Sequence, residues 1–286
     1  MLKRKTFECK AYAKINLSLN VYNKTKENLH NLESLICFIN LYDEIKINQS
    51  KYFSIRIEGP FKKYLKNNEN IIKKAFIAYS KLSNVKTKYK ICLKKNIPVS
   101  AGLGGGSADA AAILKGLNYL NNNKINKKTL LKLAMNIGSD VPVCLNSKNA
   151  FISGYGDILT KVSSIPPFFV LLINPKKELS TKKVFESYKV KNKTKKKIIN
   201  INKLNFSKWI LKQRNDLEEY SIKILPEIKD MLNFFSISKN CFFFSMTGSG
   251  PTVFGLFKNK IDVINANHIL NKNYSKWWSG IYSLKT

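Results

Sequence analysis

The sequence predicts an α+β fold in which helices alternate with mostly antiparallel strands. Three observations predict it. Residues 11–21 alternate apolar and polar side chains with the period of two that a half-buried strand requires. Residues 69–82 instead carry apolar side chains at helical spacing. In the last third of the chain, helix-like and strand-like segments follow one another, which favours mixed layers over a pure bundle or sandwich.

The elements follow from the same periodicities, taken in chain order. Strands are predicted near residues 11–21, 33–39, 44–49, 52–58, 87–94, 149–153, 168–174, 241–246 and 252–257, with a last strand at the C-terminal end. Helices are predicted near residues 69–82, 108–120, 127–137, 181–188, 207–222, 224–235 and 261–271. The lysine-heavy residues 189–202 show no periodicity and are predicted to form a solvated connection.

A domain boundary is expected where glycine and proline punctuate the chain, within residues 154–167. We therefore expect an N-terminal domain over residues 1–158 and a C-terminal domain over residues 159–286. A chain of 286 residues is long enough for both.

The composition is that of a folded protein, because 44% of the residues are hydrophobic. No apolar run reaches the roughly 18 residues that a membrane span needs, and the basic N-terminus alternates instead of becoming a signal peptide. The cysteines are scattered and include no CxxC pair, so we expect core thiols and a cytoplasmic location. They are Cys9, Cys37, Cys92, Cys144 and Cys241.

The formal net charge of +32 raises the question of nucleic-acid binding. Of the 50 basic residues only Arg4, Arg56 and Arg214 are arginine, the residue that usually makes bidentate base contacts. Together with many Asn and Ile, this lysine excess is typical of an AT-rich genome. We therefore expect no nucleic-acid or membrane partner, although the charge would attract polyanionic metabolites.

A strand near residues 87–94, a glycine-rich loop at 98–106 and a helix follow one another. Glycines let backbone N–H groups approach an anion, and a helix N-terminus adds free N–H groups and a partial positive charge. This order predicts a phosphate-binding site. Ser107 and Asp109 suit the first turn of the helix. The dinucleotide, Walker and protein-kinase patterns are all absent.

The letters of this loop, "PVSAGLGGGSADAA" (98–111), resemble the phosphate loop of the GHMP kinases, a family of small-molecule kinases. Within that family they are most similar to the 4-diphosphocytidyl-2-C-methyl-D-erythritol kinases. Four further blocks agree in order: "AKINLSL" (13–19), "ENII" (69–72), "GSDVPVCL" (138–145) and "MTGSGPTVFGLF" (246–257). The resemblance thus spans nearly the whole chain.

The resemblance implies a ribosomal-S5-domain-2-like N-terminal domain, a ferredoxin-like C-terminal domain, and ATP and substrate in the cleft between them. The implied reaction transfers the ATP γ-phosphoryl group to the 2-hydroxyl of the methylerythritol unit. The implied cofactors are ATP and Mg²⁺, with Ser107 as a candidate metal ligand. We expect a monomer or a weak homodimer.

Two residues are candidates for catalysis. Asp140 is expected to take the proton of the attacking hydroxyl, and Lys14 to stabilise charge on the transferring phosphoryl group. As plain structural residues, Asp140 would cap a turn after Gly138 and Lys14 would be a surface lysine. Because Lys14 and Asn16 share the polar face of their strand, Asn16 is expected to hydrogen-bond the substrate.

The resemblance carries the binding residues over position by position. The residues expected to bind ATP are Asn70, Pro98, Val99, Ser100, Ala101, Gly102, Leu103, Gly104, Gly105, Gly106, Ser107 and Ala108. His30, Phe185 and, more weakly, Thr181 are expected at the substrate. Leu29 stands where the family has a stacking tyrosine, and Lys182 replaces a proline. The first change predicts weaker cytosine binding.

Two alternatives remain open at this point. The altered cytosine block is compatible with a GHMP kinase for another small alcohol, of the homoserine or mevalonate type. The charge is compatible with a non-enzymatic protein that binds anions or RNA.

Overall fold

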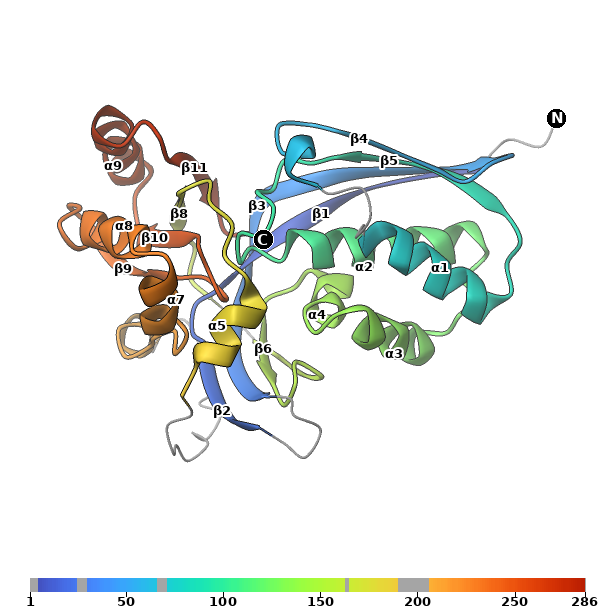
Figure 1. Ribbon diagram of the computed structural model, residues 1–286, viewed down its shortest axis with the longest axis horizontal. Coiled ribbons are helices and arrows are strands. Elements are labelled where there is room, and N and C mark those ends of the chain that lie inside the picture. Colours follow the sequence, from blue (N-terminus) through green and yellow to red (C-terminus); the bar gives the residue numbers. More distant parts are fainter. Residues whose placement is uncertain (1–4, 25–29, 66–70, 163–164, 190–205, 286) are drawn as a thin grey trace. The chain divides into compact units, whose positions relative to one another are not determined.

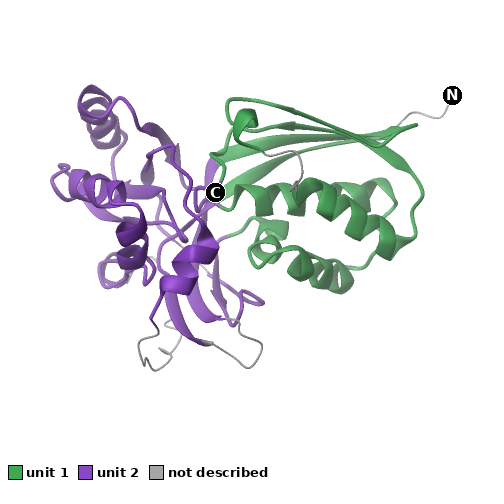
Figure 2. Cartoon of the chain, in the orientation of Figure 1, with its two compact units in different colours: residues 1–13, 41–99, 104–148 green, residues 14–40, 100–103, 149–286 purple. Residues whose placement is uncertain are grey.

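A computed structural model describes residues 5–24, 30–65, 71–162, 165–189 and 206–285. The chain forms two compact units, each assembled from separate stretches of sequence (Figure 2). Unit 1 comprises Met1–Ala13, Leu41–Val99 and Gly104–Lys148, and unit 2 comprises Lys14–Asn40, Ser100–Leu103 and Asn149–Thr286. The chain therefore passes from one unit to the other within two long strands and within the glycine-rich loop.

Unit 1 is a layer of helices on one face of a sheet (Figure 1). Its helices are α1 (Ile71–Ser83), α2 (Gly105–Leu120), α3 (Lys127–Ile137) and α4 (Val141–Asn146), with a 3₁₀ turn, η1 (Lys62–Tyr64). Its strands are β4 (Ser54–Glu58), β5 (Lys88–Lys94) and parts of β1 (Thr6–Asn16) and β3 (His30–Ser50). β3 and β5 pair antiparallel from Glu44 opposite Lys94 onward, whereas β4 runs parallel to β5.

The core of unit 1 follows the two expected periodicities. Ile45 and Ile47 of β3 are buried, whereas Glu44 and Lys46, which alternate with them, are exposed. The alanine-rich helix α2 is buried along most of its length, because its small side chains let it approach its neighbours closely. A tightly packed helix therefore starts within the glycine-rich loop, at Gly105.

Unit 2 contains two groups of strands. In the first, β2 (Asn20–Lys24) and β6 (Ala150–Ser153) pair antiparallel with the first half of β3, and β7 (Ile158–Lys161) pairs with β6. The second is a four-stranded sheet in the order β11-β8-β10-β9, made of β8 (Phe169–Asn174), β9 (Cys241–Met246), β10 (Val253–Phe257) and β11 (Trp278–Ser283).

In this four-stranded sheet every neighbouring pair is antiparallel. Helices separate β8 from β9 and β10 from β11, and the order of the four strands in space is fourth, first, third, second. This is the ferredoxin-like arrangement, so that expectation is confirmed. The helices are α5 (Thr181–Ser187), α6 (Phe206–Ile210), α7 (Glu218–Ile224), α8 (Glu227–Ser236) and α9 (Lys260–Asn273).

Three sequence-based boundaries were wrong. The strand expected over residues 11–21 is divided between β1 and β2, and the segments 33–39 and 44–49 are one continuous strand, β3. The helix expected over residues 207–222 is divided into α6 and α7. The division has a clear cause, because Leu19 accepts a hydrogen bond from the N–H of Asp216 and donates one to the carbonyl of Arg214.

The helix α4 and the strand β7 were not predicted, whereas α3 agrees with its prediction at both ends. Nearly all of residues 189–202 lies outside the described residues. Cys37 and Cys144 are buried, while Cys9, Cys92 and Cys241 are half-buried, and all five are free thiols. Among the described helices, none is both long enough and apolar enough to cross a membrane.

Candidate active site

Lys14 and Asn16 lie together at the end of β1 in unit 2. Each has only 4% of its surface exposed, and the Lys14 Nζ donates a hydrogen bond of 2.6 Å to the Asn16 Oδ1. The Asn16 Nδ2 donates in turn to the Ser34 Oγ at 2.8 Å. The expected half-buried strand is therefore buried on its polar face as well. Lys14 is not a surface lysine, and its burial strengthens any field it exerts on a nearby phosphate.

The first half of the glycine-rich loop, within unit 2, is packed against two distant segments. The backbone N–H of Lys14 donates to the Leu103 carbonyl at 2.9 Å, and the Thr247 Oγ1 donates to the Gly102 carbonyl at 3.2 Å. Thr247 also accepts a hydrogen bond from the backbone N–H of Asn16 at 3.0 Å. The structure thus brings together three motifs that the sequence had singled out separately.

Gly102 is required by this packing. Its φ of +73° lies in the left-handed region, and a Cβ at this position would lie 2.2 Å from the Thr247 carbonyl oxygen. Any side chain would therefore push the loop away from residues 246–250. The backbone approach, and not only ligand binding, demands a glycine here.

The second glycine motif, residues 246–250, is held by polar side chains that the sequence analysis missed. The Asn215 Nδ2 donates to the carbonyls of Met246 and Gly248, at 2.8 and 2.7 Å. The Glu218 carboxylate accepts from the Met246 N–H at 2.9 Å, and burial raises the pKa of Glu218 above its usual value. No periodic pattern in the sequence marks Asn215, which lies where a continuous helix was expected.

Thr181, expected at the substrate, lies next to the same motif. Its Oγ1 is 2.8 Å from the Ser249 Oγ, and the Ser221 Oγ donates to the Ser249 carbonyl at 3.2 Å. Ser180 caps the helix that begins at Thr181 by accepting from the Lys183 N–H. Thr181, unlike Ser180, is therefore not needed as a helix cap, and its hydroxyl is joined to the glycine motif.

Helix α2 begins in unit 1 with the second half of the glycine-rich loop. Its cap is Gly104, with a φ of +66° and no side chain to accept from the first turn, which contains no acidic residue. The N–H groups of Gly105, Gly106 and Ser107 therefore begin a long helix without a side-chain cap, which leaves them suited to an anion. Pro98, Val99 and Ala108 lie on either side of this start.

Two expectations about this turn change. Ser107 does not cap the helix, since it is the third residue of α2, and its hydroxyl makes no hydrogen bond to the described residues. Asp109 is not at the helix start either. It is 2% exposed and is paired with Lys95 inside unit 1. Ser107 is thus a half-buried residue whose hydroxyl fits a phosphate-bound Mg²⁺. The carboxylate of Asp109 does not, because it is paired with Lys95.

Asp140 precedes α4 in unit 1 and is half-buried. Its side chain makes no capping hydrogen bond to the helix, although its carbonyl accepts from the Cys144 N–H at 3.3 Å. All but the last residue of α4 are buried, so the helix is firmly packed. Asp140 is therefore the N-cap residue of α4 by position, within a turn that follows Gly138, but its side chain does not cap the helix.

A third group of residues lies at the start of β3 in unit 2. The His30 ring is 5.5 Å from the Phe185 ring and 5.9 Å from the Tyr188 ring, measured between centroids. Its Nδ1 is 3.1 Å from the Tyr22 carbonyl oxygen. Its Nε2 is buried and has no hydrogen-bond partner among the described residues. Leu29 and Asn70, which the sequence also singled out, lie outside the described residues.

Because a carbonyl only accepts hydrogen bonds, the proton of a neutral His30 ring is on Nδ1 and Nε2 carries a lone pair. A buried polar atom without a partner is costly, so this position suits a ligand that supplies one. Tyr188 was missed by the sequence analysis. Its hydroxyl donates to the Val21 carbonyl at 2.9 Å, which fixes a second ring beside His30.

Comparisons with known proteins agree with this arrangement. Residues 70–148 match the model of the GHMP kinases N terminal domain, and residues 195–276 match that of the GHMP kinases C terminal. The 4-diphosphocytidyl-2-C-methyl-D-erythritol kinase of Anaplasma phagocytophilum (strain HZ) is 38% identical over 94% of this chain and 91% of its own length. The chain belongs to this family of GHMP kinases.

Other family members are similarly related. The protein of the same name from Caldicellulosiruptor saccharolyticus is 37% identical over 90% of both chains. A crystal structure of 4-(cytidine 5'-diphospho)-2C-methyl-D-erythritol kinase superposes with a TM-score of 0.78 at 25% identity, covering 96% of this chain and 99% of that one. Homoserine kinase from Cytophaga hutchinsonii reaches 0.76 at 18% identity, covering 100% and 96%, and shows the shared fold alone.

Proposed function

We propose that this GHMP kinase transfers the γ-phosphoryl group of ATP to the 2-hydroxyl of 4-(cytidine 5'-diphospho)-2-C-methyl-D-erythritol, a step of the non-mevalonate isoprenoid route. Relatives of that name cover nearly the whole chain, which supports the reaction class and the substrate together. The geometric observation that carries the substrate is the buried Nε2 of His30 beside Phe185, which has no hydrogen-bond partner in the part of the chain that the structure describes. Homoserine and mevalonate have no base to place there.

At the cytidyl end, the His30 Nε2 accepts a hydrogen bond from the exocyclic amino group of cytosine, while Phe185 offers a ring for stacking. Stacking of a base on an aromatic ring contributes roughly 1–3 kcal/mol. Thr181 and Asn16 bind the remaining polar groups of the substrate. Asn16 is well suited to this, because Ser34 and the Lys14 Nζ fix both ends of its amide.

At the reacting end, the Asp140 carboxylate takes the proton of the 2-hydroxyl as its oxygen attacks the γ-phosphorus. The new O–P bond forms, the bond between the γ-phosphorus and the bridging oxygen breaks, and ADP leaves. Lys14 stabilises the charge on the equatorial oxygens, and its burial makes that interaction stronger than it would be in water.

ATP binds along the glycine-rich loop, residues 98–108, with Asn70 at the adenosine end. The N–H groups at the start of α2 bind the phosphates. Among the described residues, no group of three or more His, Cys, Asp and Glu is placed to hold a metal. Mg²⁺ would arrive with the triphosphate and neutralise part of its charge, and Ser107 would supply a hydroxyl ligand.

The remaining features of the proposal concern the whole chain. Along the sequence, we place the N-terminal domain at residues 1–158 and the C-terminal domain at residues 159–286, with the boundary between the two ranges that the family models match. The two compact units of the fold do not follow this boundary, because unit 2 also takes in residues 14–40, 100–103 and 149–158. The protein is cytoplasmic, a monomer or a weak homodimer, and binds neither nucleic acid nor membrane. Tight RNA binding at physiological salt by a protein without kinase activity would instead favour the basic, non-enzymatic alternative.

The test is an ADP-release assay on the purified protein with three alcohols: the cytidyl compound, homoserine and mevalonate. We expect turnover of the cytidyl compound alone. A His30→Ala variant should raise the KM for that substrate about tenfold and leave the KM for ATP within twofold. Turnover of homoserine or mevalonate, with none of the cytidyl compound, would overturn the proposed substrate.

A further inference from the structure

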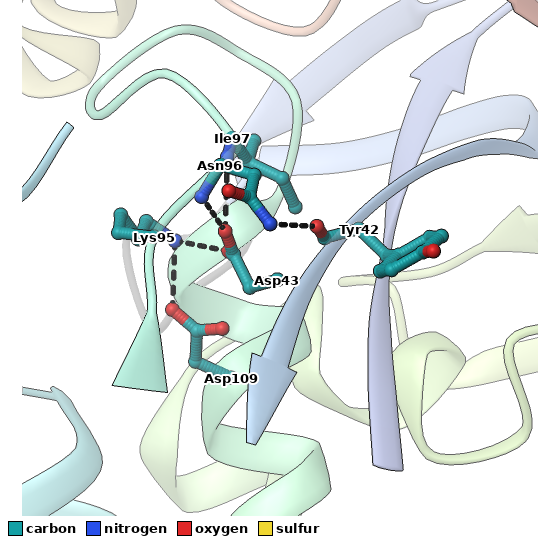
Figure 3. Close-up of polar contacts among 6 residues, drawn as sticks. All are labelled: Tyr42, Asp43, Lys95, Asn96, Ile97 and Asp109. Atoms are coloured by element: carbon teal, nitrogen blue, oxygen red, sulfur yellow. Dashed lines mark hydrogen bonds and ion pairs between the residues drawn. The ribbon is translucent and has the colours of Figure 1, made fainter. Parts of the chain in front are cut away.

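Lys95, Asp43 and Asp109 form a buried charge cluster in unit 1 (Figure 3). The Lys95 Nζ donates to the Asp43 Oδ2 at 2.5 Å and to the Asp109 Oδ2 at 2.7 Å. The side chains of Lys95, Asp43 and Asp109 are 2%, 0% and 3% exposed. Lys95 follows β5 immediately, Asp43 lies on β3, and Asp109 lies on α2, so one ammonium group joins three elements.

The cluster also holds the two residues that precede the glycine-rich loop. The second oxygen of Asp43, Oδ1, accepts the backbone N–H groups of Asn96 and Ile97 at 2.6 and 2.9 Å. The Asn96 Nδ2 donates to the Tyr42 carbonyl at 3.0 Å (Figure 3). The direction in which the chain leaves β5 is therefore fixed by these side-chain bonds together with a backbone bond, which the Lys95 N–H donates to the Glu58 carbonyl of β4 at 2.7 Å.

The same ammonium group lies against the first residue of α2. A Cβ on Gly105 would lie 3.1 Å from the Lys95 Nζ and 2.9 Å from the Ile97 Cγ2. Gly105 thus packs directly on Lys95 and on the residue just before the loop. The residues that lead into the loop, 96–97, and residue 105 therefore contact one buried cluster.

Stability alone is a poor reason for this cluster. A buried ion pair costs desolvation energy, and well-packed apolar side chains of similar volume often give equal or greater stability. Lys95 is outnumbered by two carboxylates, and the Asp109 Oδ1 has no hydrogen-bond partner among the described residues. Burial raises the pKa of Asp109 to about 8, although Lys95 opposes this and Asp43 adds to it. What the cluster provides instead is a defined position for each group that it binds.

We propose that Lys95 is a positioning residue for the nucleotide: with Asp43 and Asp109 it fixes the start of the glycine-rich loop relative to α2, so that the first N–H groups of α2 are aligned on the phosphates. This inference rests on the proposed function, which places ATP at the loop. Lys95 is not a phosphate ligand itself, because it is buried and hydrogen-bonded to two carboxylates. It acts through Gly105, Asn96 and Ile97.

The test compares three variants in the full-length enzyme: Lys95→Met, Asp109→Asn and Asn118→Ala. The first removes the ammonium at nearly constant volume, and the second keeps an oxygen that can accept from Lys95. Asn118 is the matched control, because it is a buried polar residue at the other end of α2, where it bonds both backbone groups of Ile125. KM for ATP, KM for the cytidyl substrate and kcat are measured for each.

We expect Lys95→Met to raise the KM for ATP at least tenfold while the KM for the cytidyl substrate stays within twofold. Asp109→Asn should keep the KM for ATP within threefold, and Asn118→Ala should lower stability without changing either KM. If Lys95→Met lowers only stability or kcat and leaves the KM for ATP unchanged, Lys95 is merely structural and the proposal is wrong.

Should Lys95→Met not fold, Asp109→Leu replaces it, since the bonds of Asp43 to Lys95, Asn96 and Ile97 are then kept. Its KM for ATP should rise at least threefold, and an unchanged value would equally overturn the proposal. Calorimetric titration of each variant with Mg·ATP separates this inference from the proposed function. A wild-type protein that binds ATP but does not turn over the cytidyl substrate would contradict only the latter.

Discussion

At the scale of single residues, the side chain of Asp140 makes no capping hydrogen bond to the helix that it precedes. The Asp140→Asn variant should therefore fold and bind ATP normally, with a KM for ATP within twofold. Its kcat should fall by about 10²–10⁴, the usual contribution of a positioned base. Steady-state ADP release checks both values.

Asp157 offers the matched control, since its Oδ1 accepts the Tyr155 N–H in an exposed turn of unit 2. Asp157→Asn should lose some stability and keep kcat. An Asp140→Asn enzyme with full activity would remove Asp140 from the mechanism.

Asp109 gives a prediction about pH and stability. Its pKa is raised to about 8 in the folded protein, whereas the pKa of an aspartate in an unfolded chain is about 3.9. Between these values the folded state holds a proton that the unfolded state has released, so the free energy of unfolding falls as pH rises from about 4 to about 8. Asp109→Asn should abolish this contribution.

The measurement is urea unfolding of the wild type and of Asp109→Asn at pH 5, 7 and 9. Stability of the wild type relative to the variant should decrease with rising pH, and a constant difference would contradict the assignment. The charged groups facing Asp109 are Lys95 and Asp43, and the Cys9 thiol, whose pKa burial raises to about 11, stays protonated through most of this range. The raised pKa of Glu218 acts equally in both proteins.

At the scale of elements, the first turn of α2 contains a glycine, Gly106, that we expect nucleotide binding to require and folding not to require. A Cβ on Gly106 would meet only the Ile71 Cγ2, at an ordinary 3.6 Å, so the fold has room for it. Gly106→Ala should stabilise the helix by about 0.4–1 kcal/mol. It should also raise the KM for ATP several-fold, because the new methyl group lies where phosphates approach the N–H groups.

Thermal unfolding and ADP-release kinetics together test this prediction. The comparison variant is Gly102→Ala, which should be strongly destabilised by its clash with Thr247. A more stable Gly106→Ala enzyme with an unchanged KM for ATP would show that the phosphates do not approach the first turn of α2.

Helices and strands were predicted correctly from the sequence where the residues that determine their ends lie close by in the chain. Helix α3 has a side-chain cap at Asn126 and a glycine at its other end, so both boundaries were readable. The prediction of one continuous helix across Asn215 was wrong. The helix is interrupted by hydrogen bonds to Leu19, which lies almost two hundred residues earlier in the chain. The burial of Lys14 could not be predicted from the sequence either, because the alternation of apolar and polar residues does not show what covers the polar face of a strand.

The candidate site residues follow the same rule. Lys14, Asn16 and Thr181 were singled out through a resemblance of whole blocks, and all three lie within unit 2. Asn215, Glu218 and Tyr188 were missed, because each acts by holding a backbone segment or a ring that only the folded chain brings near. The Lys95 cluster was missed for the same reason, since a lysine after a strand is unremarkable in a lysine-rich sequence.

At the scale of the whole molecule, the formal charge of +32 has a kinetic consequence. Both proposed substrates are polyanions, and a strongly basic protein attracts them over a distance that salt shortens, from about 10 Å at 0.1 M to about 3 Å at 1 M. Raising KCl from about 0.05 to about 0.5 M should increase the KM of both substrates about three- to tenfold.

The kcat should stay within twofold over the same range, because bound substrates are no longer steered. Sucrose at matched osmolality is the control and should leave both KM values unchanged. If both KM values are flat in KCl, the charge has no part in substrate capture and reflects the base composition of the genome alone.

The contact between Gly105 and the Lys95 ammonium also bears on how such sequences diverge. Of the glycines in "GLGGG", Gly102 is constrained by the Thr247 carbonyl and Gly105 by Ile97 and Lys95, whereas Gly106 has space around it. These three glycines look like parts of one phosphate-binding signature, but each is required for a different reason. Among related chains, residues 95, 97 and 105 should covary: alanine becomes admissible at 105 only where smaller residues replace both Ile97 and Lys95, while the glycine at 106 persists only as long as a nucleotide is bound.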